Sequence, residues 1–201
     1  VDPSFISEFH VAGIDMMGSY LKQLGFSEVR ETAEGAYLVK TEYERMIEED
    51  KPDVLISSCC DTVVQLIQKY HPQALPYLAP VLSPMLASGQ KIRAEFPGAC
   101  VVYIGPCLAR KDEAQKYPGF VDWVLTFEEL EKWFRQKGIQ VETCEVKKTD
   151  GRMSRLFART GGVVACMSRK LEQNGYQYVA VDGMRNCISA IREIKEGNMQ
   201  R

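Results

Sequence analysis

The chain lacks the features that mark several large classes of protein. No apolar run approaches the length of a membrane span, and the N-terminus has no basic and apolar signal pattern, so we expect neither a membrane nor a secreted protein. A net charge of −2, from 25 basic and 27 acidic side chains, gives no electrostatic footprint for nucleic acid. The chain also has no low-complexity segment and no repeat of fixed period. Its two histidines, His10 and His71, lie far from the clustered cysteines, which disfavours a zinc site.

Cysteine is well represented. Seven cysteines are an odd number, so a closed disulfide framework would leave one unpaired. Without a secretory signal, the expected location is the reducing cytoplasm, where cysteines more often serve metals or catalysis than disulfides.

Short apolar runs alternate with amphipathic stretches, which is typical of an α/β protein with mainly parallel strands. We expect strands at FSEVRE, DVLIS (53–57), CVVYI (100–104), VDWVL (121–125), VETCEV and YQYVAV. Expected helices cover 4–24, 33–49, 61–70, 85–96, 110–117, 127–138, 162–175 and 185–196. Thr126 and Glu129 form a capping-box pattern before FEELEKWFRQKG. The proline-rich stretch 71–84 suggests a crossover between two lobes, 1–80 and 81–201, each with a small twisted sheet flanked by helices.

Two cysteine motifs share one architectural position. Ser58-Cys59-Cys60 follows the run DVLIS, and Gly105-Pro106-Cys107 follows CVVYI, each just before an expected helix. Ligands collect beyond the carboxyl ends of such strands, and helix N-termini favour thiolate over thiol. A buried hydrophobic role remains the preferred interpretation for the other four cysteines: Cys100, Cys144, Cys166 and Cys187.

The segments around these motifs are similar to a known family. SSCC, SPMLASGQKIRAEF, VVYIGPCLARKDEA, VDWVLTFEEL and RTGGV, in this order, resemble the catalytic domain of the [FeFe]-hydrogenases over essentially the whole chain. The resemblance implies two α/β lobes with a cleft between them that holds an H-cluster. This cofactor is a [4Fe–4S] cubane joined through a cysteine sulfur to a diiron unit that carries CO and cyanide.

The resemblance also implies roles for single residues. Cys59 would pass protons to the diiron unit, while Cys60 and Cys107 would be two of the four thiolates that such a cubane normally takes. Arg110 stands in the place of a lysine that contacts a cyanide ligand in active enzymes. Glu42 falls near the glutamate of their proton path, although a surface charge explains it at least as well.

Further residues would line the cluster pocket by the same resemblance. They are Ser58, Ser83, Pro84, Met85, Pro106, Gly161 and Gly162. For the Ser-Pro-Met and Thr-Gly-Gly segments, a helix start that needs small residues is an equally good interpretation.

The chain departs from the family pattern at several positions. Asp61-Thr62-Val63 follow the paired cysteines where hydrogenases usually have Pro-Gly-Trp, and Gly105 stands where a methionine is common. We expect the missing thioether to leave space in the pocket and to change its polarity. Together with Arg110, these changes favour a divergent or sensory member.

The third cysteine motif of the family, ACxxGC, does not occur in the sequence, and neither does the CxxCxxCxxxCP run of a ferredoxin-type cluster. We therefore expect a fragment, inactive and cluster-free by itself, of a parent that interconverts protons and hydrogen or senses redox state. Expected partners are electron-transfer iron–sulfur proteins or domains of the parent. Two alternatives stay open: a non-catalytic regulatory or interaction domain, and, less favoured, a zinc or thiol redox protein.

Overall fold

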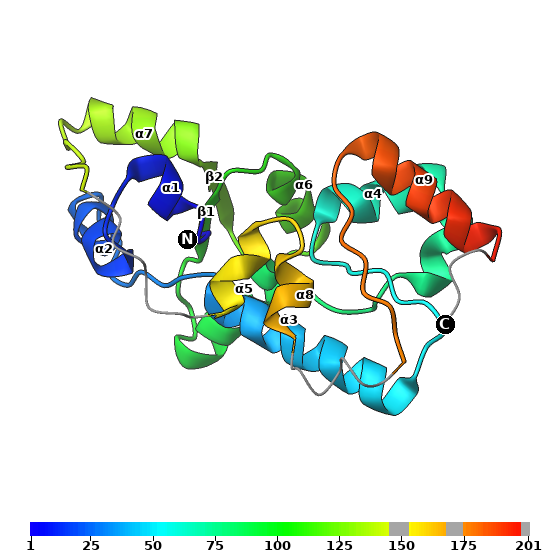
Figure 1. The fold of residues 1–201 in the computed structure, drawn as a ribbon. Coiled ribbons are helices and arrows are strands. Elements are labelled where there is room, and N and C mark those ends of the chain that lie inside the picture. Colours follow the sequence, from blue (N-terminus) through cyan, green and yellow to red (C-terminus); the bar gives the residue numbers. More distant parts are fainter. Residues whose placement is uncertain (145–152, 168–174, 198–201) are drawn as a thin grey trace.

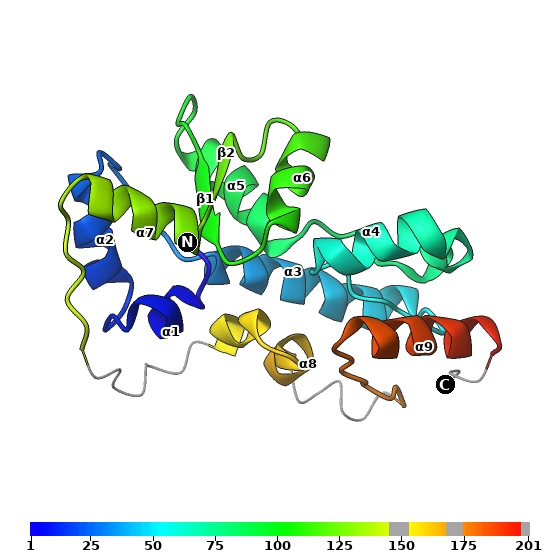
Figure 2. The ribbon, with the colours of Figure 1, turned by 90° about the horizontal axis from the view of Figure 1, so that it is seen from above.

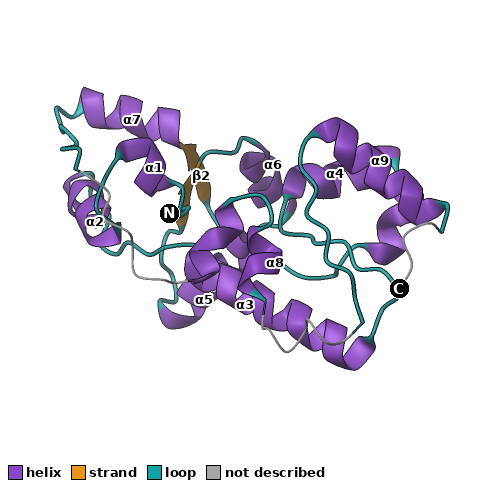
Figure 3. Cartoon of the chain, viewed as in Figure 1, coloured by secondary structure: helices purple, strands orange, loops and turns teal. Residues whose placement is uncertain are grey.

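The computed structural model describes residues 1–144, 153–167 and 175–197 (Figure 1). Over these residues the chain is a mainly helical α/β domain with one small parallel sheet, as Figure 3 shows. The sheet pairs β1 (Val102–Gly105) with β2 (Trp123–Thr126), and Val102 lies opposite Trp123. None of the described helices combines the length and apolar composition needed to cross a bilayer.

The helices vary from a single turn to more than three turns. They are α1 (Phe5–Phe9), α2 (Ile14–Gln23), α3 (Ala33–Arg45), α4 (Asp61–Tyr70), α5 (Pro84–Glu95), α6 (Ala109–Lys116), α7 (Phe127–Gln136), α8 (Gly162–Cys166) and α9 (Met184–Lys195). A π-helical turn, η1 (Met46–Asp50), extends α3, and two 3₁₀ turns are η2 (Pro72–Tyr77) and η3 (Met153–Ala158). In Figures 1 and 2, α1, α2 and α7 gather at one end and α4 and α9 at the other, with α3 between them.

Several elements lie where the sequence predicts them. Helix α4 has the predicted bounds, and β1 and β2 overlap the predicted runs CVVYI and VDWVL. The capping box before α7 is confirmed: Thr126 Oγ1 accepts the Glu129 N–H, and the Glu129 carboxylate accepts the Thr126 N–H. These are elements with strong local signals.

Other predictions are wrong. The helix expected over 4–24 is broken, because His10 adopts a left-handed conformation that ends α1. FSEVRE and YQYVAV form no strand, and DVLIS contributes only an isolated parallel bridge between Ile56 and Leu78. An apolar run forms a strand only where a partner strand lies beside it, and YQYVAV is instead largely exposed, with Val179 at 59%. The described part of VETCEV, 141–144, is irregular, and 145–146 lie outside the described residues.

The structure differs from two further expectations, one on a helix and one on the sheets. The helix expected from 162 to 175 ends at Cys166, and 168–174 lie outside the described residues. One sheet is present in the described part of the chain, where a sheet in each of two lobes was expected.

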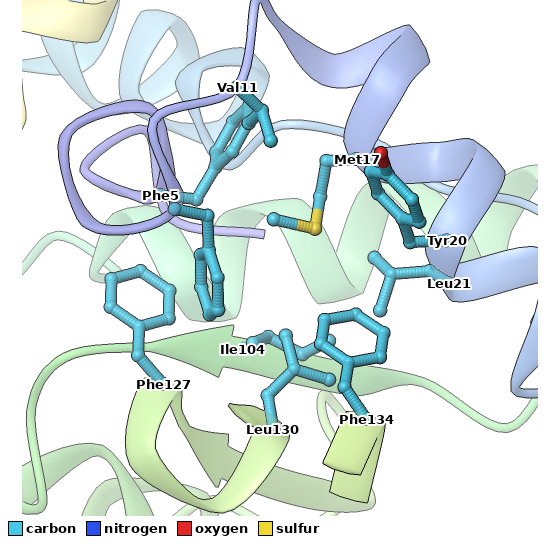
Figure 4. Packing of buried hydrophobic residues seen from close by; sticks show 10 residues of the cluster. Phe5, Val11, Met17, Tyr20, Leu21, Ile104, Phe127, Leu130 and Phe134 are labelled. Atoms are coloured by element: carbon cyan, nitrogen blue, oxygen red, sulfur yellow. The ribbon is translucent and has the colours of Figure 1, made fainter. Parts of the chain in front are cut away.

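The largest hydrophobic cluster joins the N-terminal helices to the sheet and α7 (Figure 4). Phe9 makes edge-to-face contacts with Phe127 and Phe134 at centroid distances of 5.5 and 6.2 Å. Ile104 of β1 and Leu21 of α2 are buried in the same cluster. The core therefore draws on both sides of the division at residue 80, and that division stays a prediction.

Helices α3 and α5 cross at very short range. A Cβ atom added to Gly35 would lie 2.2 Å from the Pro84 carbonyl oxygen and 2.7 Å from the Ser88 backbone nitrogen. Only glycine permits this approach, so Gly35 fixes the start of α5, with Ser83 and Met85, against α3.

Gly35→Ala is expected to lower the free energy of unfolding by about 3 kcal/mol, because the added methyl group forces α3 and α5 apart. Gly18→Ala is the matched control, since Gly18 is also a buried helical glycine but its added methyl would meet only Val29, at 3.7 Å. Higher helix propensity should make that variant more stable by about 0.5–1 kcal/mol. Urea unfolding followed by circular dichroism measures both, and equal effects would contradict the close crossing.

Candidate functional site

Both cysteine motifs lie at the start of a helix. Cys60 is the N-cap of α4 and is exposed, while Cys107 follows β1 and lies two residues before α6. The prediction of a strand end followed by a helix is confirmed for Cys107. For Cys60 the helix is present, but an isolated bridge at Ile56 replaces the strand.

The Arg110 side chain connects the two motifs. Its Nη2 donates to the Cys59 carbonyl oxygen over 2.7 Å, and its Nη1 donates to the Glu113 carboxylate over 2.5 Å. The Arg110 and Glu113 side chains are only 14% and 4% exposed. Burial lowers the pKa of Arg110, but the Glu113 carboxylate and other neighbouring groups together raise it by more. The pKa therefore rises overall, and the guanidinium stays charged. A buried cation from the second motif thus holds the loop of the first.

The Cys59 thiol is enclosed. Its Sγ lies 2.9 Å from Ser57 Oγ and 3.6 Å from the Tyr43 hydroxyl oxygen, and it packs against a cluster that includes Val39 and Ala79. Burial raises the pKa of Cys59 despite the opposing effect of these hydrogen bonds and of Arg110. The sequence interpretation missed Tyr43 and Ser57, although the four-residue spacing of Val39 and Tyr43 signals one buried helix face.

Glu42 lies on a more open part of α3. Its side chain is 44% exposed and pairs with Arg45 over 2.8 Å, and this hydrogen bond lowers the pKa of the carboxyl. This placement favours the surface-charge interpretation, and a proton-path role for Glu42 stays a prediction.

The expected pocket-lining segments have structural tasks. Ser83 caps α5 by accepting the Leu86 N–H, and Pro84 occupies the first helical position. Gly161 has a φ of 74°, and a Cβ on Gly162 would lie 1.6 Å from the Leu156 carbonyl oxygen. The helix-start interpretation therefore accounts for both segments, and their contact with a cofactor stays a prediction.

Two other expected lining residues lie within the motifs themselves. Ser58 is buried and donates to the Val81 carbonyl oxygen over 2.7 Å, whereas Pro106 is exposed. A lining role for either stays a prediction.

The expectation of free space at Gly105 is wrong, because the Tyr103 ring fills it. A Cβ on Gly105 would lie 2.6 Å from the Tyr103 hydroxyl oxygen and 2.7 Å from its Cε1. The Tyr103 hydroxyl donates to Asp2 Oδ2 over 3.0 Å, and burial, reinforced by Asp2, raises the pKa of the phenol. Arg110 and Cys107 are near enough to influence the same pKa. The site therefore has a buried tyrosine where its sequence pattern suggests a gap.

A [4Fe–4S] cubane normally takes four thiolate ligands. Cys60 and Cys107 supply two sulfur donors, and Cys187 of α9 lies near enough to Cys60 to be influenced by it. In the described ranges, however, no three His, Cys, Asp or Glu residues are grouped to hold a metal ion. The described residues thus fit only half of the ligand set.

Comparison with known proteins identifies the family. The sequence model described as "Iron only hydrogenase large subunit, C-terminal domain" matches residues 2–201. The chain belongs to this iron-only hydrogenase family. The family normally binds an H-cluster with a [4Fe–4S] subcluster.

Individual hydrogenases show the same similarity. Iron hydrogenase 1 of Clostridium pasteurianum is 25% identical over 215 residues, which cover 94% of this chain and 38% of that protein. A variant of [FeFe]-hydrogenase HydA1 from Chlamydomonas reinhardtii is 26% identical with a TM-score of 0.56, covering 68% of this chain and 40% of that one. A HydA(deltaEFG) structure concerned with stepwise H-cluster assembly is 28% identical with a TM-score of 0.56, covering 75% and 44%. This iron-only hydrogenase domain spans less than half the length of each of these relatives.

Arg110→Leu is expected to lower the free energy of unfolding by about 3–5 kcal/mol, because it leaves Glu113 buried without a partner. Adding Glu113→Leu should recover a large part of the loss, since no buried charge then remains. Arg135→Leu is the control: it removes an exposed pair with Glu131 and should change stability little. Urea titration of the native protein, the single variants Arg110→Leu and Glu113→Leu and their double variant gives the coupling, with Arg135→Leu measured beside them. Purely additive effects would contradict a buried pair.

Gly105→Ala is expected to cost about 1–3 kcal/mol in the native background, because its methyl group overlaps the buried Tyr103 ring. In a Tyr103→Leu background the same substitution should cost much less. In a Tyr103→Phe background, which loses the hydroxyl but keeps Cε1 and Cζ at 2.7 and 2.8 Å, most of the cost should remain. Thermal unfolding of the three pairs measures this. A cost that does not depend on residue 103 would show that the ring does not occupy this space.

Proposed function

We propose that this chain is an H-cluster-type iron–sulfur domain of an [FeFe]-hydrogenase-like protein. Its parent would carry out hydrogen and proton redox chemistry, or sense hydrogen or redox state. The observation that carries the proposal is the hydrogen bond from Arg110 to the Cys59 carbonyl, since it joins the two motifs expected to supply the ligands. The family match over residues 2–201 supports the same conclusion.

In this proposal the cluster lies between the starts of α4 and α6, in a cleft between two lobes. Cys60 and Cys107 would hold the cubane, which supplies one-electron chemistry when it is bound. The Arg110 guanidinium and the positive ends of two helices would stabilise negative charge there. Cys59, one residue from the ligand Cys60, would present a thiol to the reacting side.

Within this family, a sensory or electron-transfer role is favoured over rapid turnover. Arg110 already donates to Glu113 and to Cys59, so the side chain expected to contact the cluster is engaged within the protein. Tyr103 occupies the space beside Gly105. Asp61, in place of the usual proline, is buried and accepts a hydrogen bond from Gln65 over 2.6 Å. Iron–sulfur proteins or domains in the cytoplasm would be its electron partners.

The engagement of Arg110 equally supports a second candidate, a regulatory or interaction domain that keeps the hydrogenase fold without the H-cluster. A guanidinium that joins two segments of the protein by hydrogen bonds holds them together whether or not a cluster is present. Iron content distinguishes the two candidates.

Reconstitution of the protein in its full natural length, with iron and sulfide and without oxygen, tests the proposal. We expect about four iron atoms per chain from the cubane. Cys60→Ser and Cys107→Ser should lose most of this iron, whereas Cys100→Ser and Cys144→Ser, which alter cysteines outside the two motifs, should keep it. Iron and sulfide analysis gives the result.

Loading the reconstituted protein with a diiron precursor then separates the possible roles. Infrared bands of bound CO and cyanide with hydrogen turnover would identify a hydrogenase, and those bands without turnover would favour a sensor. A protein that takes up no iron would contradict the proposal and support the regulatory domain.

A further inference from the structure

A group of hydroxyls lies around the Cys59 thiol, with the Tyr43 hydroxyl at its centre. The Tyr43 oxygen accepts the Ser58 N–H over 2.9 Å and lies 3.1 Å from Ser57 Oγ and 3.2 Å from Ser58 Oγ. The Tyr43 side chain is buried, with 2% relative exposure for the residue. A buried N–H is costly to leave unpaired, so the Ser58 backbone depends on this phenol.

The donors and acceptors in this group can be assigned by starting from Ser58, which ends the chain of hydroxyls. Ser58 Oγ donates its hydrogen to the Val81 carbonyl, which can only accept, so in its contact with Tyr43 the serine must accept. A single order of donors and acceptors then makes a hydrogen bond of each of the three contacts within 3.2 Å. In this order the thiol donates to Ser57, Ser57 donates to Tyr43, and Tyr43 donates to Ser58. In this arrangement Cys59 is a donor, which agrees with its buried surroundings.

The backbone of the loop is held at three successive points. Tyr43 accepts the Ser58 N–H, Ser57 Oγ accepts the Cys59 N–H over 3.3 Å, and Arg110 donates to the Cys59 carbonyl. Two of these contacts belong to the Tyr43 group and one comes from the second motif. Cys59 is therefore fixed from both sides, by α3 and by α6.

We propose that Tyr43 is the positioning residue of Cys59, and that its hydroxyl holds the thiol in place rather than carrying protons. The chain of hydroxyls ends on the Val81 carbonyl, which has no proton to pass on. It therefore fixes the position of the thiol but offers no path for protons. The positioning is a property of the protein itself, and only the use of the thiol rests on the proposed function.

Tyr43→Phe tests this, because it removes the hydroxyl and keeps the ring. In the full 201-residue chain, reduced and without added iron, we expect iodoacetamide to alkylate Cys59 about tenfold faster than in the native protein. Cys166, which is buried elsewhere on α8, is the internal control and should change by less than about twofold. Fragment-ion mass spectrometry separates Cys59 from the adjacent Cys60.

Tyr20→Phe is the matched control, since it removes the hydroxyl of another buried tyrosine, which accepts the Glu142 N–H in the N-terminal cluster, and should leave the Cys59 rate unchanged. Ser57→Ala removes the hydroxyl next to the thiol and should also make the alkylation of Cys59 faster. This variant tests the proposal if Tyr43→Phe does not fold. An unchanged Cys59 rate, or equal acceleration of Cys59 and Cys166, would overturn the proposal. The measurement needs no cluster, so its outcome is independent of iron reconstitution.

Discussion

The buried charge of Arg110 is the constraint on which the arrangement of the site depends. A guanidinium that is 14% exposed must be paired, and its two acceptors come from α6 itself and from the loop before α4. Satisfying the charge therefore requires two segments about fifty residues apart in sequence to meet. The planar fork of arginine reaches both acceptors at once, which the point charge of a lysine does less well. Arg110 thus also shapes the loop around Cys59.

The parts of the fold that the sequence predicts well have local causes. Helix α4 and the capping box of α7 depend on residues within a few positions of each other, and both are present. The failures have distant causes. DVLIS resembles a buried strand and YQYVAV a strand, but whether an apolar run becomes a strand depends on its neighbours. Of these two runs, only DVLIS finds a partner, through Ile56. The signals that divide the first helix are weak: histidine adopts the left-handed conformation more readily than most residues, and Gly13, the N-cap of α2, lies inside the expected helix.

The candidate site shows the same division. Cys107 could be located because strand, turn and helix follow one another there, and Cys60 because a helix begins at it. The contacts of Arg110 and Tyr43 could not be located, because they join distant segments. Tyr103 is an intermediate case. Side chains at i and i+2 of a strand point to the same face, so the ring of residue 103 was placed to cover residue 105. The pattern contained that signal, and the expectation of free space came from considering Gly105 alone.

The paired cysteines now have a physical explanation. Cys60 has an extended backbone, so the two side chains leave the loop in different directions. Cys59 turns inward, where burial raises the pKa of its thiol and Tyr43, Ser57 and Arg110 fix its position. Cys60 is exposed at the positive end of α4, where a metal or a partner has access to it. Two adjacent cysteines of one loop, Cys59 and Cys60, thus lie in different environments, one enclosed and one exposed. In the proposed function this separation would leave Cys60 open to a cofactor, while burial keeps the proton on the Cys59 thiol.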